Sequence, residues 1–465
     1  MLEAILMLAP ALAGVIYGED EGVAYIITAL ICLTVGGALS FKKPKRNVFY
    51  LKEGCVATAL SWVILSLFGC IPFMITKEIP FFINALFETV SGFTTTGSTI
   101  IDDVEAMSHA SLLWRSETHW IGGMGVLVFI MAVVSLSGGS NINLLKAESP
   151  GPSVGKLVPK MKTTARWLYV IYAAFTVAEF LFLVIGKMPV FDALCTALGT
   201  AGTGGFGVKN NSIGGYSPYV QWVVTIFMLL FGVNFNAYYF IILRQLKKAF
   251  SIDEVKVYFS IVLCGIAIFF LNSHRLFNTT GEALRAASFQ TASLVTSTGF
   301  TTVDYDTWPN LSKLLALMLM TVGACSGSTG GGIKVSRFII AFKGAYNEIC
   351  SYIHPKSVRR TRMDGNTLSE DIIRATAIYI FTFAAIFAAS IFIVAIEGHD
   401  YMTNFSAVLA EMNNIGPGMS MAGPSETFSF FTPLSKCVFI FDMLAGRLEL
   451  YPMLLLINPA VWKRS

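Results

Sequence analysis

Four short turns in the chain carry residue types that could bind an ion through oxygen atoms. Each turn ends in a glycine that follows two residues whose backbone carbonyls or hydroxyl groups could serve as ligands. The candidates are Thr95, Thr96 and Gly97; Thr203, Gly204 and Gly205; Ser297, Thr298 and Gly299; and Asn414, Ile415 and Gly416. Selection of a dehydrated cation requires oxygens at fixed separations, which rings of backbone carbonyls provide. Glycine allows successive carbonyls to face one axis because it adopts positive φ freely.

The type of ion follows from what the turns lack. No carboxylate lies within any of the four turns, whereas divalent cations such as Ca²⁺ are usually held by Asp and Glu side chains. The turns therefore indicate a site for a monovalent cation. A single such turn could equally be an ordinary glycine that ends a helix in a loop. Four similar copies in one chain favour the interpretation that they converge on one pore.

Each turn follows a short segment and lies between two longer apolar helices. The short segments cover residues 82–93, 190–201, 281–296 and 401–412. The flanking helices are expected at 54–73 and 110–137, 165–187 and 219–243, 256–271 and 311–343, and 371–397 and 432–457. Three helical turns are too short to cross a bilayer, which takes about 20 apolar residues. We therefore expect half-helices that re-enter the membrane from one side, with Asn84, Asp192 and Thr403–Asn404 as candidate caps.

The composition is that of an integral membrane protein. Of 465 residues, 54% are hydrophobic and only 13% are charged, against about a quarter charged in soluble domains. We predict an all-α polytopic membrane protein with four repeats of outer helix (M1), pore helix and inner helix (M2) in a pseudo-fourfold arrangement around one pore. The expected domains are residues 1–41 with two N-terminal transmembrane helices, pore repeats 42–145, 146–250, 251–355 (with an interrupted M2 helix) and 356–465.

Other reactive residue types indicate no further chemistry. The eight cysteines are scattered, mostly in apolar stretches, and are expected to be reduced thiols. The five histidines show no metal-ligand spacing and are expected at interfacial or solvated positions; they are His109, His119, His274, His354 and His399. We find no paired carboxylates and no nucleophile–base set that would indicate an enzyme. The expected cargo is the ion alone, with no nucleotide bound by this chain and no nucleic-acid partner.

The basic residues predict the orientation in the membrane. They cluster between the repeats and at the end of the chain, as Lys42–Arg46 and Lys52; Lys146, Lys156, Lys160, Lys162 and Arg166; Arg244, Lys247, Lys248 and Lys256; Lys343, Lys356, Arg359, Arg360, Arg362 and Arg374; and Lys463 and Arg464. The connections on the other side carry the acidic residues Asp102, Asp103, Glu105, Asp304, Asp306, Glu397 and Asp400. Because Lys and Arg concentrate in cytoplasmic loops, we expect the basic loops in the cytoplasm of a bacterial or archaeal cell with this chain in its inner membrane.

A glycine-rich break interrupts the long apolar segment at 311–343. Gly327, Gly330, Gly331, Gly332 and Lys334 belong to this break. A phosphate-binding loop is a poor fit, because Ile333 separates the last glycine from the lysine and the flanks are membrane helices. A loosely packed helix kink is one explanation. The preferred hypothesis is a flexible loop that obstructs the pore beneath the four turns and acts as its gate.

Arg447 lies within the last apolar helix, where a charge is energetically expensive and normally faces a cavity or a partner. Its expected partners are Asp442 and Glu449, with Glu411 more distant in sequence. A salt bridge that only holds the fold is one possibility. The other is a guanidinium in the conduction path, which repels cations until the path opens.

The chain resembles the Trk/Ktr/HKT superfamily of potassium transporters over nearly its whole length. The resemblance rests on the turn motifs SGFTTTGST, GTGGFG, TSTGFTT and NNIGPG. The linker AESPGPSVGKLVPKM, the segment GSTGGGIKVSR, the motif GRLEL and the two leading helices are similar to the TrkH branch in particular. The resemblance implies channel-like potassium uptake, a homodimer with one pore per subunit, a gating role for the intramembrane loop, and a cytosolic, TrkA-like ring of nucleotide-binding regulatory subunits.

One rival function remains open from the sequence, and two others are disfavoured. A sodium-permeable or sodium-coupled transporter could use the same fold. Sodium-preferring members of the superfamily often carry serine at the first filter glycine, whereas this chain has Gly97. A membrane-embedded enzyme would need a polar constellation such as a Ser/Lys pair or HExxH, which is absent from the sequence. A carrier built from inverted repeats is disfavoured, because all four copies are expected to run in the same orientation.

Overall fold

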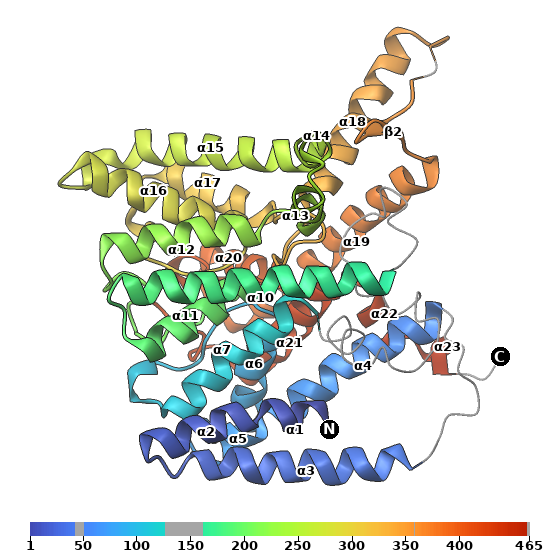
Figure 1. Ribbon diagram of the computed structural model, residues 1–465. Coiled ribbons are helices and arrows are strands. Elements are labelled where there is room, and N and C mark those ends of the chain that lie inside the picture. Colours follow the sequence, from blue (N-terminus) through green and yellow to red (C-terminus); the bar gives the residue numbers. More distant parts are fainter. Residues whose placement is uncertain (42–50, 126–160, 358, 463–465) are drawn as a thin grey trace.

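The computed structural model of the chain describes residues 1–41, 51–125, 161–357 and 359–462 and consists almost entirely of helices (Figure 1). The N-terminal part contains α1 (Leu2–Leu6), α2 (Leu8–Tyr17) and α3 (Gly22–Ser40). α2 and α3 form a tight hairpin, in which a Cβ on Gly14 would lie 2.6 Å from Gly22 Cα. The two predicted leading helices are therefore present, although Met7 separates the first of them into α1 and α2.

The remaining helices are grouped by predicted repeat, and each repeat is expected to contain an outer helix, a pore helix and an inner helix. The first repeat contains α4 (Leu51–Gly69), α5 (Ile71–Ile75), α6 (Phe82–Phe93), η1 (Val104–Ala106) and α7 (His109–Gly123). The second contains α10 (Met161–Ile185), α11 (Val190–Gly202), α12 (Pro218–Phe231), α13 (Phe235–Ile242) and α14 (Leu246–Ser251). The third contains α15 (Asp253–Ser273), η2 (His274–Leu276), α16 (Thr280–Val295), η3 (Tyr305–Thr307), α17 (Asn310–Thr321) and α18 (Val335–Ile353).

A small hairpin leads into the fourth repeat. Its strands β1 (Arg362–Met363) and β2 (Asn366–Thr367) pair antiparallel, with Arg362 opposite Thr367 and a turn at Asp364–Gly365. The fourth repeat contains α19 (Glu370–Val394), η4 (Ala395–Glu397), α20 (Tyr401–Met412), η5 (Ser420–Ala422), α21 (Pro433–Arg447), α22 (Tyr451–Ile457) and α23 (Pro459–Trp462).

The half-helices α6, α11, α16 and α20 lie within two residues of the predicted bounds. The residues predicted as helix caps do not cap these helices in the structure. Asn84 and Asp192 lie inside α6 and α11, and their side chains bond to Lys436 and Tyr216 instead. Thr403 and Asn404 lie inside α20, whose cap is Asp400 with its carboxylate accepting from the Thr403 N–H.

The inner helices of the second and fourth repeats are broken where continuous helices were expected at 219–243 and 432–457. α12 and α13 meet at 88°, and the Asn234 side chain caps the start of α13 by accepting from Asn236 N at 3.0 Å. α21 and α22 are separated at Glu449 and Leu450, whose φ values are +59° and +67°. The predicted third-repeat helix at 311–343 is interrupted as expected, between α17 and α18. The expected helix at 110–137 lies partly outside the described residues.

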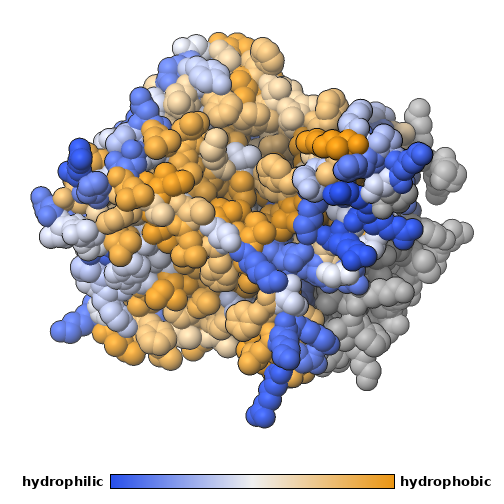
Figure 2. Space-filling view, turned by 90° about the horizontal axis from the view of Figure 1, so that it is seen from above, coloured by the Kyte–Doolittle hydropathy of each residue, from blue (hydrophilic) through white to orange (hydrophobic). Residues whose placement is uncertain are grey.

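The surface is that of a protein embedded in a bilayer. Figure 2 shows a broad apolar band across the middle of the visible face, with hydrophilic residues gathered toward both ends. Among the described residues, five helical segments are long and apolar enough to cross a membrane, and the bent pair α12–α13 would make a sixth. These five are Gly22–Ser40, Lys52–Ile75, Trp167–Ile185, Asp253–Leu276 and Glu370–Glu397.

Candidate functional site

The four predicted turns share one backbone conformation. We call residues 95–98, 203–206, 297–300 and 414–417 the ring segments. The first and third residue of each segment have positive φ: Thr95 (57°) and Gly97 (88°), Thr203 (55°) and Gly205 (81°), Ser297 (54°) and Gly299 (81°), and Asn414 (54°) and Gly416 (98°). The glycines were expected to adopt this conformation. The positive φ of the four preceding non-glycine residues has no signal in the sequence, since L-residues rarely adopt it.

Equivalent hydrogen bonds enforce the unusual conformation. The second residue of each segment donates its N–H to a carbonyl five residues earlier, in the last turn of the half-helix. These bonds run from Thr96 to Ser91, Gly204 to Gly199, Thr298 to Ser293 and Ile415 to Ala410, each at 2.9 Å. Such bonds are typical of helices that end in a left-handed residue. All four half-helices therefore end against the ring segments in the same way.

The four segments contact one another in a closed cycle. A Cβ placed on Gly97 would lie 2.0 Å from Gly204 O, one on Gly205 2.1 Å from Thr298 O, one on Gly299 2.0 Å from Ile415 O, and one on Gly416 2.8 Å from Thr96 O. Real Cβ atoms do not approach oxygen so closely, so each glycine is required by this contact as well as by its φ. The chain thus brings all twelve predicted site residues together, in the order first, second, third, fourth and back to first.

A buried histidine supports the ring from behind. His119 on α7 contacts the carbonyl of Gly92 through Nδ1 at 2.7 Å, and its Nε2 accepts from Phe206 N at 3.2 Å. The imidazole of His119 is therefore the neutral tautomer with its proton on Nδ1. A Cβ on Gly204 would lie 2.2 Å from the imidazole. The expectation of an interfacial or solvated position was wrong for His119, which is fully buried, because its partners lie 27 and 87 residues away in sequence.

A buried ion pair holds the outer ends of the first two ring segments. Arg115 Nε lies 2.8 Å from Glu88 Oε1, with side-chain exposures of only 2% and 0%. The guanidinium also donates to Gly207 O at 3.3 Å, and Glu88 accepts from Ile100 N at 3.0 Å. A buried charge requires such paired bonds. The pair was not predicted, because Arg115 and Glu88 lie on different helices and no spacing rule relates them.

The glycine-rich loop between α17 and α18 lies directly against the third and fourth ring segments. Gly331 N donates to Ser297 Oγ at 2.5 Å. A Cβ on Gly331 would lie 2.6 Å from Asn413 O, and one on Gly330 would lie 2.8 Å from Thr296 O. These glycines therefore allow the loop to approach the half-helix ends more closely than any other residue would. Gly327 and Gly332 have positive φ, at 67° and 71°.

Polar groups fix the loop at both ends. The Glu254 carboxylate accepts from Ser326 N at 2.6 Å and Ser336 N at 3.1 Å. Phe235 N donates to Gly327 O at 3.1 Å, across the α12–α13 bend. Within the loop, the buried Lys334 Nζ donates to Gly330 O and to Gly331 O, the latter at 3.3 Å. The side-chain nitrogen of Lys334 therefore lies in the loop, beside the two glycines that touch the half-helix ends.

Arg447 connects this loop to two inner helices. Its guanidinium donates to Thr329 O in the loop at 2.9 Å, and to the carbonyls of Gly122 and Gly123 at the end of α7, the latter at 2.9 Å. The carboxylates expected as its partners bond elsewhere. Glu449 pairs with Arg337, and Asp442 accepts from Ser390 Oγ at 2.8 Å. Arg447 is therefore bound to backbone carbonyls of the first and third repeats rather than paired along its own helix.

Comparison with known proteins identifies the family. The family model described as "TrkH: Cation transport protein" matches residues 21–463. The "Trk system potassium uptake protein TrkH" of Salmonella typhimurium is 32% identical, over 98% of this chain and 96% of its own length. The protein of that name from Halomonas elongata is also 32% identical, over 100% of this chain and 97% of its own length.

A solved structure agrees with these relatives. The crystal structure of the potassium transporter TrkH from Vibrio parahaemolyticus superposes with a TM-score of 0.88 at 29% sequence identity. The match covers 99% of this chain and 97% of that one. The chain is therefore a multi-pass, all-α membrane protein that belongs to the TrkH family of cation transport proteins.

Proposed function

We propose that this protein takes up potassium ions across the cell membrane, and that the ring segments form its selectivity filter. The closed cycle of contacts among the four segments carries this proposal, because the carbonyl oxygens of Thr96, Gly204, Thr298 and Ile415 each lie beside the glycine of a neighbouring segment. The names of the similar proteins, which are potassium uptake proteins, favour K⁺ as the ion. The other eight residues of the four turns supply further carbonyls and the backbone geometry.

The ends of the half-helices support binding of a cation. α6, α11, α16 and α20 all end at the ring, where their last carbonyls have no partner within the helix. Helix C-termini carry partial negative charge, so four of them favour a cation in the space that they face. A sodium-permeable or sodium-coupled transporter is the alternative. The presence of Gly97 rather than serine favours potassium, as the family resemblance implies.

The loop and Arg447 form the proposed gate. Gly327, Gly330, Gly331, Gly332 and Lys334 belong to a segment that contacts the ends of two half-helices from within the protein. Arg447 adds a positive charge next to this segment, and Lys334 adds a second when it is protonated. These charges would repel a cation that leaves the filter on this side. Opening then requires the loop to move and the bond from Arg447 to Thr329 O to break.

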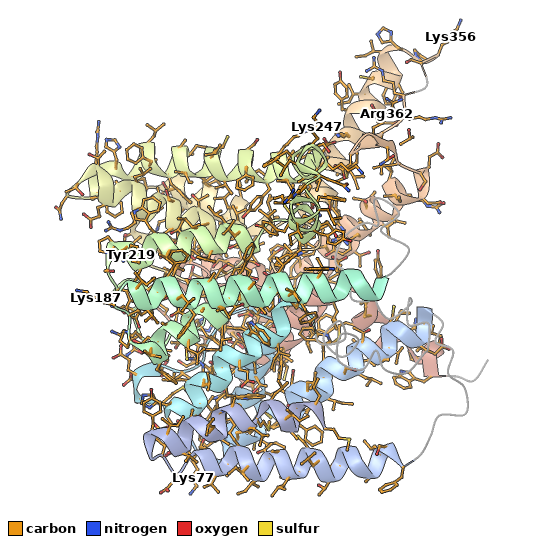
Figure 3. All side chains as sticks on the ribbon, in the orientation of Figure 1. Lys77, Lys187, Tyr219, Lys247, Lys356 and Arg362 are labelled. Carbon is orange, nitrogen blue, oxygen red and sulfur yellow. The ribbon has the colours of Figure 1, made fainter. Side chains whose placement is uncertain are left out.

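The basic residues support the proposed orientation. Lys247, Lys356 and Arg362 lie toward one end of the molecule, whereas Lys77 and Lys187 lie at the opposite end (Figure 3). The end with the larger basic clusters is assigned to the cytoplasm of a bacterial inner membrane. The gate then faces the cytoplasm and the filter faces the outside. We propose the same domain limits as the sequence indicates, at residues 41, 145, 250 and 355; the limit at residue 145 lies outside the described residues.

A homodimer and a cytosolic nucleotide-binding ring complete the proposal. α18 projects from the body of the protein at the basic end (Figure 1). It exposes apolar side chains three or four residues apart, including Phe342 (72% exposed), Tyr346 (61%) and Ile349 (60%). Residues with this spacing share one helix face, and such a face favours protein contacts. Because the loop is joined to α18, a partner bound to α18 could move the gate.

Rescue of a potassium-uptake-deficient bacterium tests the filter assignment. Gly205→Ser and Gly299→Ser each place a Cβ about where a neighbouring carbonyl oxygen lies, so neither variant should restore growth at low potassium. Gly398→Ser is the matched control, because Gly398 has the same φ of 81° as these two glycines but nothing within 4 Å of its Cβ position. The control should rescue growth. Full rescue by both ring variants, expressed at wild-type levels, would contradict the filter assignment.

A further inference from the structure

The four sides of the ring are not equal. A Cβ built on the ring glycine would lie 2.0–2.1 Å from the nearest carbonyl oxygen of the next segment between the first and second, second and third, and third and fourth segments, but 2.8 Å from it between the fourth and the first. We call the junction of residues 414–417 with residues 95–98 the closing seam. At this seam the carbonyl oxygen of Thr96 lies farther from the Gly416 Cβ position than its counterparts do at the other three sides, so this contact is the loosest of the four.

Side-chain hydrogen bonds cross the closing seam. Ser98 Oγ donates to Gly416 O at 2.9 Å, and Asn414 Nδ2 donates to Thr96 Oγ1 at 3.0 Å. Asn414 Nδ2 also donates to Met443 O on α21 at 2.9 Å, so the amide is anchored to the inner helix of its own repeat. At the other three sides, no side-chain hydrogen bond joins one described ring segment directly to the next. The side with the loosest carbonyl contact is therefore the one at which side chains of the ring segments themselves bond across the junction.

We infer that the closing seam sets how strictly the ring discriminates between monovalent cations, and that Ser98 and Asn414 are the residues that fix its width. The inference rests on the proposed role of the ring as an ion filter. A carbonyl ring prefers the larger K⁺ when its oxygens cannot close around the smaller Na⁺. Close backbone contact provides that restraint at three sides. At the closing seam, the bonds from Ser98 and Asn414 provide it.

Ion competition in liposomes tests the seam. Rubidium influx through purified protein is measured with increasing K⁺ or Na⁺ as competitor, and the ratio of the two inhibition constants reports selectivity. Ser98→Ala and Asn414→Leu should each lower the preference for K⁺ over Na⁺ by about 3- to 10-fold, the factor expected for one lost hydrogen bond.

Ser273→Ala is the matched control. The Ser273 hydroxyl is also buried and donates to a backbone carbonyl, that of Phe269 at 2.6 Å, but within the outer helix α15. The inhibition ratio of this variant should stay at the wild-type value. A ratio within twofold of wild type for Ser98→Ala, with potassium flux retained, would overturn the inference even if Asn414→Leu fails to fold. If the purified wild-type protein transports no potassium, that result would instead contradict the proposed function itself.

Discussion

Arg447 donates a hydrogen bond of 2.9 Å to the carbonyl oxygen of Thr329, which joins the inner helix of the fourth repeat to the loop of the third. The same guanidinium binds Gly123 O at the end of α7, in the first repeat. One side chain thus holds three repeats together on the inner side of the ring. Its position makes a structural role and a gating role separable by experiment.

Replacement of Arg447 by alanine should increase potassium flux in the absence of the regulatory ring. The substitution removes a positive charge from the proposed path and releases the loop at Thr329. Flux is measured in liposomes and normalised to folded protein by size-exclusion chromatography. Arg374→Ala is the control, because Arg374 pairs with Asp371 on the exposed surface. A lower yield of folded protein with unchanged flux per molecule would assign Arg447 to the fold alone.

Deletion of Gly327–Gly332 should also raise flux without the regulatory ring. The deletion removes the glycines that contact Ser297, Thr296 and Asn413. The measurement is the same flux assay, combined with a melting curve of the purified variant. If a well-folded deletion variant shows unchanged or lower flux, the loop is not the obstruction.

Substitution of His119 should destabilise the protein through the ring. His119→Leu leaves Phe206 N buried without its partner, which costs about 1–3 kcal/mol, and removes one of the two bonds to Gly92 O, which still accepts from Thr95 N at 3.1 Å. The midpoint of thermal unfolding in detergent should therefore fall. His274→Leu serves as the control, since His274 is exposed and bonds only locally to Leu271 O. Equal midpoints for the two variants would mean that His119 does not support the ring.

The N-terminal hairpin should lose stability in acid. Glu19 lies in the turn between α2 and α3, and burial raises the pKa of its carboxyl. Hydrogen bonds from the His109 ring and from the backbone N–H groups of His109 and Ala110 outweigh that effect, so the pKa lies below its ordinary value of 4.5. A lowered pKa contributes stability above about pH 4.5 that is lost as the pH falls through the folded-state pKa. The protection of the α2 amide hydrogens against exchange, relative to the intrinsic exchange rate at each pH, should therefore fall below about pH 4.5.

Glu19→Gln provides the comparison for that pH dependence. The amide cannot ionise, so the protection of the α2 amide hydrogens in this variant should be lower than in the wild type at neutral pH. That protection should also change less on acidification. An identical pH profile for the variant and the wild type would show that Glu19 does not anchor the hairpin to α7.

The half-helices could be predicted from sequence because their limits depend on local features. A dozen residues between glycine-rich turns and apolar helices left little choice for α6 and α20. The breaks at Asn234 and at Glu449–Leu450 could not be predicted in the same way. They depend on a side-chain cap and on two non-glycine residues with positive φ, which tertiary contacts stabilise.

The composition of the ring was predictable, but the groups that support it were not. The turn glycines are visible as a repeated pattern. By contrast, the bond from Ser98 to Gly416 joins residues 318 positions apart, and the Arg115–Glu88 pair joins two helices of one repeat. Such contacts depend on how the repeats pack, and no spacing within a single helix indicates them. Arg447 was recognised as unusual, yet its carbonyl partners in other repeats were not foreseen.

Ion competition through the purified wild-type protein tests the central claim most directly. Rubidium influx into liposomes is measured with K⁺ or Na⁺ added at equal concentrations outside. A potassium-selective carbonyl filter predicts strong inhibition by K⁺ and much weaker inhibition by Na⁺. Equal inhibition by the two ions, or equal direct fluxes of Na⁺ and K⁺, would contradict the assignment of the ring as a potassium filter.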